Sequence, residues 1–404
     1  MLSYTDARQK VIEVAGAILR PALRTQVEIE QAFGRILAAP VLADRDYPPF
    51  DRTTRDGFAV RAEDAQKPGA RLECIGELRA GGHFDATVLP CQCVEIMTGA
   101  SIPRGADAVV MIEHTKRDGQ TITLDRAAQK GDHIVPRGSE ARAGALLVAP
   151  KTRLGYAEMA LAAQAGATRL EVFASPRLAI LSTGDEVVDA RTMPGPLQVR
   201  NSNGISIEIL ARTAGAETIQ LGNAPDEKGA LRSAIERGLE ADILVLSGGV
   251  SMGKYDLVEQ VLADLGAEFH FTGVQIRPGR PAVFATCRGK LVFGLPGNPV
   301  STMVTFELFV LPVVDMFNGA APRPLPVFRA KLATTVREKG PMTHFLPARI
   351  EWEGREARVT QLPWQGSGDI VALALANGFL IVGPERPEIA PGEWVDVLPR
   401  RGAI

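Results

Sequence analysis

The sequence predicts a multidomain protein that combines a mostly parallel α/β domain, covered by helices on both faces of its sheet, with two β-rich domains and a helical N-terminal domain. Three observations support this fold class. At 404 residues the chain is too long for one ordinary hydrophobic core. From residue 177, continuous apolar strands alternate with amphipathic helices. Elsewhere, short β-type runs are separated by Gly, Pro and Asp, which is typical of small β domains.

The N-terminal region is expected to be helical. In residues 6–19 the apolar side chains recur at helical spacing after a Thr5/Asp6 cap, and residues 28–38 continue in the same style. Residues 155–167 again have a helical pattern. The two helical parts are therefore expected to form one domain that the β-rich segment interrupts.

The α/β pattern begins with the strand "RLAILS" and ends with a long apolar helix over residues 300–317. A Pro-rich linker over residues 318–326 follows, and the last eighty residues alternate short strands and turns, which predicts a C-terminal β-barrel. The predicted domains are 1–43 with 147–175 (helical, discontinuous), 44–146 (β-rich), 176–325 (α/β) and 326–404 (β-barrel).

Composition limits the possible functions. Lys and Arg total 45 against 47 Asp and Glu, so no global basic field attracts nucleic acid or an anionic membrane. An anionic ligand would need a local site. No uninterrupted apolar run reaches the length of a membrane span and the first ten residues are not a signal peptide, so we expect a cytoplasmic protein. Four cysteines and five scattered histidines favour neither a disulfide scaffold, a structural zinc nor a catalytic triad.

Three glycine-containing turns follow predicted strands and precede helices: "STGDEV", "SGGVSMGKYD" and "GLPGNPVS". Ligands of such sheets bind at the carboxyl ends of the strands, where glycine lets them approach the backbone and helix N-termini favour anions. The predicted binding residues in these turns are Gly184, Asp185, Gly248, Gly249, Ser251 and Gly297.

Carboxylates gather in the same region. Asp185, Glu186, Asp226 and Asp256 all follow strands of the predicted sheet. Hard oxygen ligands beside a pocket of phosphate type favour Mg²⁺. The alternative is that each carboxylate only caps a helix.

Two further stretches each have a functional and a simpler interpretation. "GGVSMGKY" approaches a P-loop, but Tyr255 stands where Ser or Thr would hold Mg²⁺, so kinase or ATPase activity is not favoured. In "IRPGRP", Arg277 and Arg280 flank a Pro-Gly turn and are suited to bind an oxyanion; the alternative is an exposed hairpin with two solvated arginines.

The stretch "YPPFDRTTRDGFAV" sets Asp51 and Asp56 after a rigid pair of prolines. An exposed turn is the simple explanation.

Taken together, the chain resembles the molybdopterin molybdenumtransferase family, the MoeA and gephyrin E-domain proteins. The resemblance covers nearly the whole chain and rests on seven stretches in family order: "PPFDRTTRDGFAV", "EIMTGASIPRGADAVV", "STGDE", "LSGGVSMGKYD", "IRPGRP", "GLPGNPVS" and "QGSGDI". It implies the domain arrangement predicted above. It also implies the transfer of molybdenum from molybdate to adenylylated molybdopterin, with release of AMP and a requirement for Mg²⁺.

The resemblance also assigns roles to residues. It implies Asp56, Thr98 and Glu186 as catalytic residues and Glu186, Asp226 and Asp256 as metal ligands. For the stretch after the double proline it implies, instead of an exposed turn, a site loop in which Asp56 positions a metal ion or a water molecule. To the substrate-binding set it adds Arg277, Arg280, Pro296, Pro299, Arg349 and Ser367. The sequence departs from many relatives at Arg55, where a neutral residue is common, and at the two arginines of "IRPGRP", where lysines are common.

The resemblance implies a homodimer in which Asp56 of one chain and the partner's Glu186 serve one site. It also implies a separate molybdopterin adenylyltransferase as upstream partner, because the chain lacks the extra domain that adenylylates the pterin in fused relatives. No nucleic acid or membrane partner is expected. Two other functions stay open at this point: a gephyrin-like scaffold, and a phosphoanhydride hydrolase on the same fold.

Overall fold

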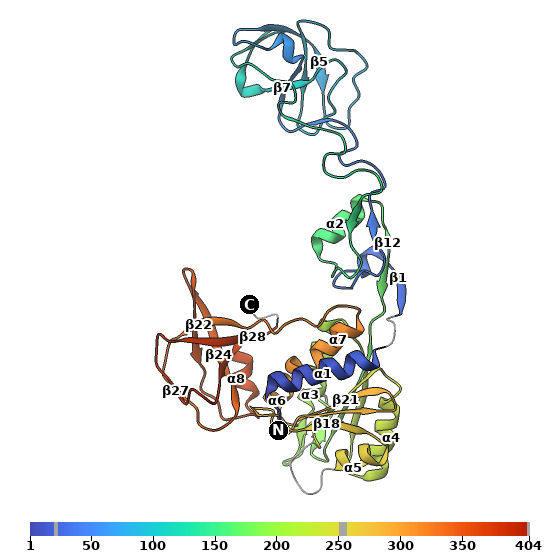
Figure 1. Cartoon of the computed structure of the whole chain (residues 1–404), viewed down its shortest axis with the longest axis vertical. Coiled ribbons are helices and arrows are strands. Elements are labelled where there is room, and N and C mark those ends of the chain that lie inside the picture. The colour runs from blue at the N-terminus through green and yellow to red at the C-terminus, as the bar shows by residue number, and fades with distance from the viewer. Residues whose placement is uncertain (20–22, 250–256, 402–404) are drawn as a thin grey trace. The chain divides into compact units, whose positions relative to one another are not determined.

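The computed structural model describes residues 1–19, 23–249 and 257–401 (Figure 1). The chain divides into two compact units. The first, here called the α/β-barrel unit, comprises Met1–Thr25, Gly34–Ala38 and Glu171–Ile404. The second, the β-rich unit, comprises Gln26–Phe33 and Ala39–Leu170.

The α/β-barrel unit is built on a six-stranded sheet with the order β16-β13-β17-β21-β20-β18. The first four strands are parallel, and β20 and β18 continue the sheet antiparallel. The strands are β16 (Glu217–Ala224), β13 (Arg177–Thr183), β17 (Ile243–Ser247), β21 (Lys290–Leu295), β20 (Val283–Cys287) and β18 (Glu268–Thr272).

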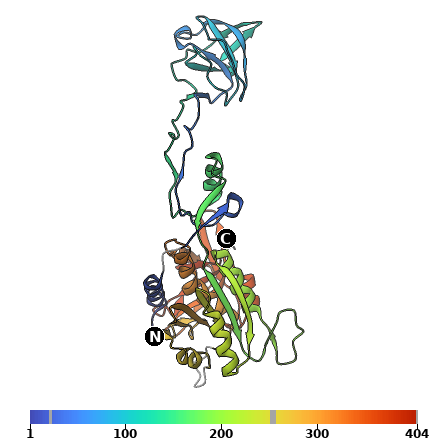
Figure 2. The same cartoon turned by 90° about the vertical axis from the view of Figure 1, so that its right-hand side faces the viewer.

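Both faces of this sheet are buried. Leu178 and Ile180 of β13 pack into one core together with helices α1, α3, α6 and α7, whereas Ala179 and Leu181 pack into a second core with α4 and α5 (Figures 1 and 2). Burial on both faces explains why the strands are continuously apolar. The helices are α1 (Tyr4–Ile18), α3 (Ser202–Ala214), α4 (Lys228–Gly238), α5 (Leu257–Asp264), α6 (Pro299–Thr305) and α7 (Leu311–Phe317), with a π-helical segment η4 (Phe306–Val310) between the last two.

The N-terminal helix lies in a different place from the one expected. The buried residues of α1, Ala7, Val11 and Ala15, belong to the core of the α/β sheet rather than to a separate helical domain. The helix expected over residues 28–38 is also wrong, because only the 3-10 turn η1 (Ile29–Gln31) forms. Gly34 adopts a φ of 77°, and this left-handed conformation ends the helical path.

The β-rich unit contains a six-stranded sheet with the order β7-β4-β6-β5-β9-β8. Its strands are β4 (Gly57–Val60), β5 (Arg71–Leu78), β6 (Gln92–Ile96), β7 (Ala108–Met111), β8 (Thr115–Asp118) and β9 (Thr121–Leu124). The same unit holds helix α2 (Tyr156–Gln164) and the paired short strands β2 (Val41–Leu42) with β11 (Leu146–Val148) and β3 (Arg52–Thr53) with β10 (Ile134–Val135). Strands β1 (Arg24–Glu28) and β12 (Arg169–Phe173) lie where the chain passes between the units.

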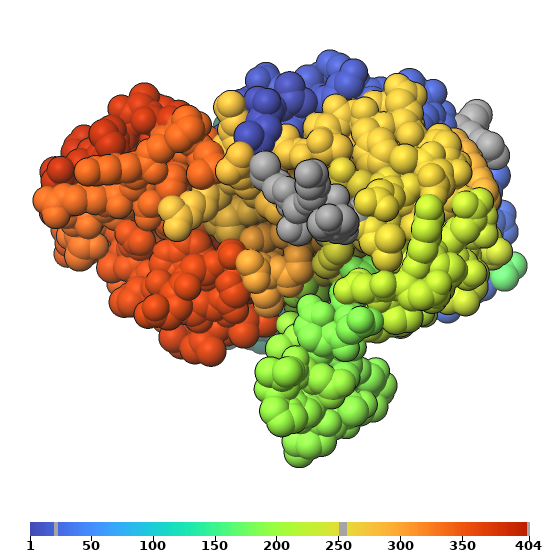
Figure 3. Space-filling model, turned by 90° about the horizontal axis from the view of Figure 1, so that it is seen from below, coloured from blue at the N-terminus to red at the C-terminus, as the bar shows by residue number. Residues whose placement is uncertain are grey.

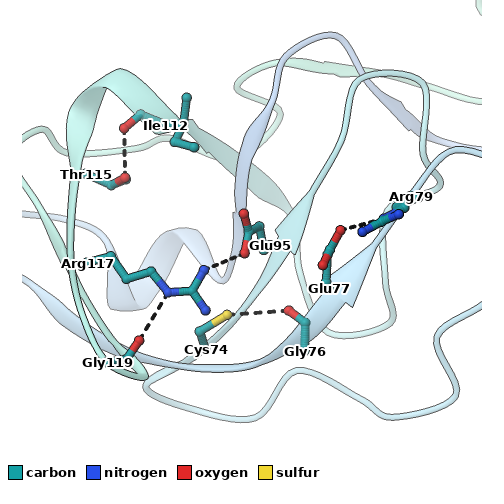
Figure 4. A network of polar contacts seen from close by, with 9 residues as sticks. All are labelled: Cys74, Gly76, Glu77, Arg79, Glu95, Ile112, Thr115, Arg117 and Gly119. Atoms are coloured by element: carbon teal, nitrogen blue, oxygen red, sulfur yellow. Dashed lines mark hydrogen bonds and ion pairs between the residues drawn. The ribbon is translucent and has the colours of Figure 1, made fainter.

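Figure 4 shows polar contacts of this unit, of which one joins two strands, β8 and β6. The guanidinium of Arg117 on β8 donates to the carboxylate of Glu95 on β6 at 2.6 Å and to the carbonyl of Gly119 at 3.1 Å. Cys74 lies beside them as a free thiol, and burial raises the pKa of its neighbour Cys93 to about 12. Cys93 is buried in the core of this sheet, and its raised pKa keeps the thiol protonated at neutral pH.

The C-terminal region forms the closed, barrel-like sheet that the sequence predicted. Strands β24, β25, β22, β28 and β26 follow one another, and the pairing of β24 with β26 closes the ring. The strands are β22 (Phe328–Leu332), β24 (Thr343–Glu353), β25 (Glu356–Gln361), β26 (Gly378–Val382) and β28 (Trp394–Pro399), with β19 (Ile276–Arg277) joined to β24, the pair β23 (Val336–Arg337) and β27 (Glu388–Ile389), and helix α8 (Ile370–Leu375).

One helical run, Pro299–Phe317, is long and apolar enough to cross a membrane by length and composition alone. In the structure 83% of this window is buried. Its apolar character is therefore explained by its place in the core beside the α/β sheet.

Gly57 opens β4, between β6 and β7, and shows how tightly this sheet is packed. A Cβ atom at this position would lie 2.0 Å from the carbonyl oxygen of Val110 on β7. The glycine next to Asp56 is thus required by the close approach of two strands.

We predict that Gly57→Ala lowers the free energy of unfolding by about 3 kcal/mol, the upper part of the usual range for overpacking. Gly16→Ala is the contrasting control, because its Cβ would lie 3.6 Å from Met316 Cε and alanine favours a helix by about 0.5–1 kcal/mol. Chemical denaturation of both variants measures the difference. Equal stability of Gly57→Ala and the wild type would contradict the crowding argument.

Candidate functional site

A cavity of about 790 Å³ lies at the carboxyl ends of β13, β17 and β21. Beside it, the segment with the short strands β14 (Val187–Val188) and β15 (Val199–Arg200) projects from the α/β body (Figure 3). The cavity is lined by residues of all three glycine turns that the sequence singled out, among them Gly184, Glu186, Gly248, Gly249, Pro296, Gly297 and Pro299, and also by Asp226 after β16. Such an edge is where ligands of parallel α/β sheets bind.

Two carboxylates, those of Glu186 and Asp226, line the acidic side of the cavity, and the Asp185 carboxylate interacts with Asp226 next to it. The backbone N–H of Asp226 donates to Asp185 Oδ1 at 3.0 Å. Burial, together with the charges of Asp185 and Glu186, raises the pKa of Asp226. Gly184 belongs to the turn of Glu186 and has a φ of 124°, and a Cβ at this position would lie 2.7 Å from Glu186 Oε2. The turn therefore needs glycine to hold Glu186 in this position.

The oxygen ligands that these carboxylates offer are of the kind that a hard divalent cation prefers. Their mutual repulsion is the kind that a bound cation relieves, and Mg²⁺ binds through carboxylate oxygens. Among residues 1–19, 23–249 and 257–401, no three His, Cys, Asp or Glu side chains are close enough to form a complete metal cluster. The predicted ligand Asp256 and the predicted contact Ser251 lie outside the described residues.

Neutral polar side chains form another part of the lining, and sequence reasoning missed them. Ser182, Thr183 and Ser247 end strands β13 and β17, and all three are buried. Asn201 and Asn203, from the start of α3, also line the cavity. The stretch "RNSNG" could have indicated Asn201 and Asn203, because it places two asparagines at the start of a helix, at the ligand-binding end of the sheet.

The loop Pro296–Pro299 connects this edge to the barrel region of the same unit. Asn298 Nδ2 donates to Ser367 Oγ at 2.8 Å, and the N–H of Val300 donates to the Ser367 carbonyl at 3.0 Å. Gly368 itself lines the cavity. The predicted residue Ser367 therefore lies against the predicted loop and supports it.

The predicted arginines lie outside the cavity lining. Arg277 is exposed and is paired through its backbone with the buried His344, while Arg280 is exposed and precedes the lining residue Pro281. Arg349 donates to the carbonyl of Leu375 at the end of α8. Among the described residues, Arg200 is the only basic residue in the lining.

Asp56 and Thr98 come together in the β-rich unit. Asp56 Oδ1 accepts hydrogen bonds from the Thr98 N–H at 2.6 Å and from the Thr98 hydroxyl at 2.7 Å. The backbone hydrogen bond first, and the hydroxyl second, lower the pKa of Asp56. Asp56 is thus ionised at neutral pH, so it can hold a cation or orient a water molecule but cannot supply a proton.

The neighbours of Asp56 have structural partners. Asp51 Oδ1 accepts from the N–H of Arg137 at 2.7 Å, and Arg52 forms an ion pair with Glu140 at 2.8 Å. Of the two aspartates in the stretch, Asp51 therefore fixes the loop, while Asp56 accepts from the "MTGA" turn.

We predict that Thr98→Val raises the pKa of Asp56 toward its usual range without reaching it, because the backbone donor remains. A lowered pKa stabilises the fold above the usual value of about 3.9, and this contribution is lost as pH falls through the lowered value. Carbon NMR titration of the carboxyl group measures the shift. Thr98→Ser is the control that keeps the hydroxyl; a pKa in Thr98→Val equal to that of the wild type would refute the assignment.

For Asp226 the sign is opposite. Its raised pKa means that the folded protein disfavours the charged form, so stability increases as pH falls through the raised value. Asp226→Asn should therefore increase stability at pH 7 without added metal, by no more than about 0.5 kcal/mol for this exposed site. Thermal denaturation measures this, and with Mg²⁺ the wild type should gain more stability than the variant.

The matched control is Glu227→Gln. Glu227 caps α4 by accepting from the N–H groups of Gly229 and Ala230, which lowers the pKa of Glu227. Its neutralisation should destabilise the protein at pH 7. If both substitutions changed stability in the same direction, the argument from repulsion at Asp226 would be wrong.

Known proteins resemble this chain in sequence and in fold. Residues 2–166 match the MoeA N-terminal region (domain I and II), residues 179–316 a probable molybdopterin binding domain, and residues 329–399 the MoeA C-terminal region (domain IV). A crystal structure of the molybdopterin biosynthesis moeA protein from Pyrococcus horikoshii OT3 superposes with a TM-score of 0.82 at 26% identity, covering 99% of this chain and 100% of that one.

Two curated relatives, from Bacillus subtilis and Nostoc sp., carry the name molybdopterin molybdenumtransferase. The chain is 34% identical to the first over 382 residues, covering 92% of this chain and 89% of the relative. It is 39% identical to the second over 310 residues, covering 75% of this chain and 71% of the relative. These matches confirm the resemblance that the seven motifs indicated: the chain belongs to the MoeA family of molybdopterin molybdenumtransferases.

Proposed function

We propose that the protein is a molybdopterin molybdenumtransferase, which inserts molybdenum from molybdate into adenylylated molybdopterin and releases AMP during molybdenum cofactor biosynthesis. The observation that carries this proposal is identity of 34% along 89% of a relative that bears this name. The cavity at the carboxyl ends of β13, β17 and β21 supports it, because its turns and the N-terminus of α3 offer donors to phosphate groups.

The acidic side of the cavity supports a requirement for Mg²⁺ as part of this proposal. Glu186 and Asp226, with Asp256, would hold the ion, and its chemistry there is to neutralise phosphoanhydride oxygens as a Lewis acid. Without a cation these carboxylates repel a nucleotide substrate. The Asp185 carboxylate accepts a hydrogen bond from the backbone N–H of Asp226 and so fixes the turn that carries Asp226.

Asp56 is proposed to position a water molecule or a cation during the transfer. Its ionised state favours this role over proton donation, and two donors from Thr98 hold the carboxylate in one orientation. A homodimer, a cytoplasmic location and a separate molybdopterin adenylyltransferase upstream complete the proposal.

The decisive experiment supplies the purified protein with adenylylated molybdopterin, molybdate and Mg²⁺. AMP release and molybdenum bound to the pterin are measured together, with and without molybdate. A transferase gives both products only when molybdate is present. AMP release that does not depend on molybdate would instead indicate a phosphoanhydride hydrolase, and the absence of both products would leave a scaffold.

We predict that Asp56→Asn lowers turnover about a hundredfold, the scale for losing one preorganised electrostatic group. The variant should fold normally, because asparagine keeps the oxygen that accepts from Thr98. Asp51→Asn is the matched control in the same loop and should retain turnover within about twofold. Full molybdenum insertion by a folded Asp56→Asn protein would show that the stretch is an ordinary exposed turn.

A further inference from the structure

Two asparagines at the start of α3 bind the ends of three neighbouring strands. Asn201, the N-cap residue, donates from Nδ2 to Ser182 Oγ at the end of β13 (2.9 Å). Asn203 donates from Nδ2 to Ser247 Oγ at the end of β17 (2.9 Å) and to the carbonyl of Gly297, just after β21 (2.7 Å). Each bond reaches one of the three turns that line the cavity.

The amide of Asn203 can point in only one direction. Both contacts use its nitrogen as the donor, so rotating the amide by half a turn would place Oδ1 against the Gly297 carbonyl, two acceptors facing each other. Asn203 is 9% exposed, and its Oδ1 is buried without a hydrogen-bond partner in the described part of the chain. The fold tolerates this buried acceptor in order to keep the two donor contacts.

The turns that Asn203 joins also touch each other. A Cβ on Gly297 would lie 3.5 Å from the Cα of Gly248, and the N–H of Gly248 donates to the carbonyl of Leu295 at 3.1 Å. Helix α3, which carries the asparagine, is fixed by Ile207 and Ala211 in the core. The side chain of Asn203 therefore couples a firmly packed helix to two backbone turns of the cavity.

We propose that Asn203 is a positioning residue for molybdenum transfer, which sets the spacing between the Gly248 turn and the Pro296–Pro299 loop. This inference rests on the function proposed above. It assigns Asn203 no contact with the reacting atoms. Small misplacements of substrate-positioning groups cost up to about a hundredfold in rate, so loosening this link should reduce activity more than stability.

The test compares Asn203→Asp with Asn318→Asp. Aspartate has nearly the same shape as asparagine, but its carboxylate would repel the Gly297 carbonyl. Asn318 is a matched control, because it is also buried and also bonds α3, at the opposite end, through the Ala214 carbonyl at 3.3 Å. Both variants lose one buried amide, and only Asn203 faces the cavity.

Per folded protein, Asn203→Asp should lower kcat/KM for adenylylated molybdopterin at least tenfold and raise KM. Asn318→Asp should stay within about twofold of the wild type. A purely structural role would reduce the folded fraction and leave KM unchanged, and that result would overturn the proposal. If Asn203→Asp does not fold, Asn203→Ala, which adds no charge, is measured against Asn318→Ala with the same criteria.

Hydrogen exchange provides a readout that needs no activity. In the Asn203 variants, exchange at the amides of Gly248 and Val300 should accelerate at least tenfold over the matched Asn318 variants. Equal exchange would overturn the link between the turns. A wild-type protein that transfers no molybdenum would overturn the proposed function and with it the role in transfer, while the exchange experiment still decides whether Asn203 joins the turns.

Discussion

The site depends on one constraint, the burial of a parallel sheet on both faces. Strands β13, β17 and β21 pair in parallel, so they end at the same edge, and the helices of their crossover connections cover both faces of the sheet. The hydrogen bonds between neighbouring strands fix the spacing of the strands, and they therefore also fix the spacing of the turns that follow the strands. Residues more than a hundred positions apart, such as Glu186 and Gly297, therefore line one cavity without any direct bond between them.

Electrostatics divides the candidate residues into two kinds. The pKa of Asp226 is raised because burial and two nearby carboxylates disfavour its charge, whereas the pKa of Asp56 is lowered because two donors from Thr98 favour its charge. Asp226 therefore gains from a cation, and Asp56 is already stabilised without one. Two aspartates that look equivalent in the sequence therefore have pKa values shifted in opposite directions. The difference arises from neighbours that are distant in the chain.

This pattern also explains how far the sequence could be interpreted. The α/β strands were predictable, because burial on both faces leaves a continuous apolar run, and the three turns followed from them. The place of α1 was not, because an amphipathic helix does not specify which apolar surface it covers. Asn203 was missed for a similar reason: its partners Ser247 and Gly297 are 44 and 94 positions away, and only the fold brings them together. The steric need for Gly57 likewise depends on a neighbouring strand.

The charge of the cavity limits how it can bind its proposed substrate. Its described lining includes Glu186 and Asp226 but only one basic residue, Arg200, whereas adenylylated molybdopterin is an anion. Backbone donors alone do not offset the repulsion between these carboxylates and phosphates. A divalent cation held by the carboxylates would offset their negative charge and would itself bind phosphate oxygens. In a protein that binds Mg²⁺ at this place, the ion and the nucleotide would strengthen each other's binding by the same factor, since coupling between two ligands is reciprocal.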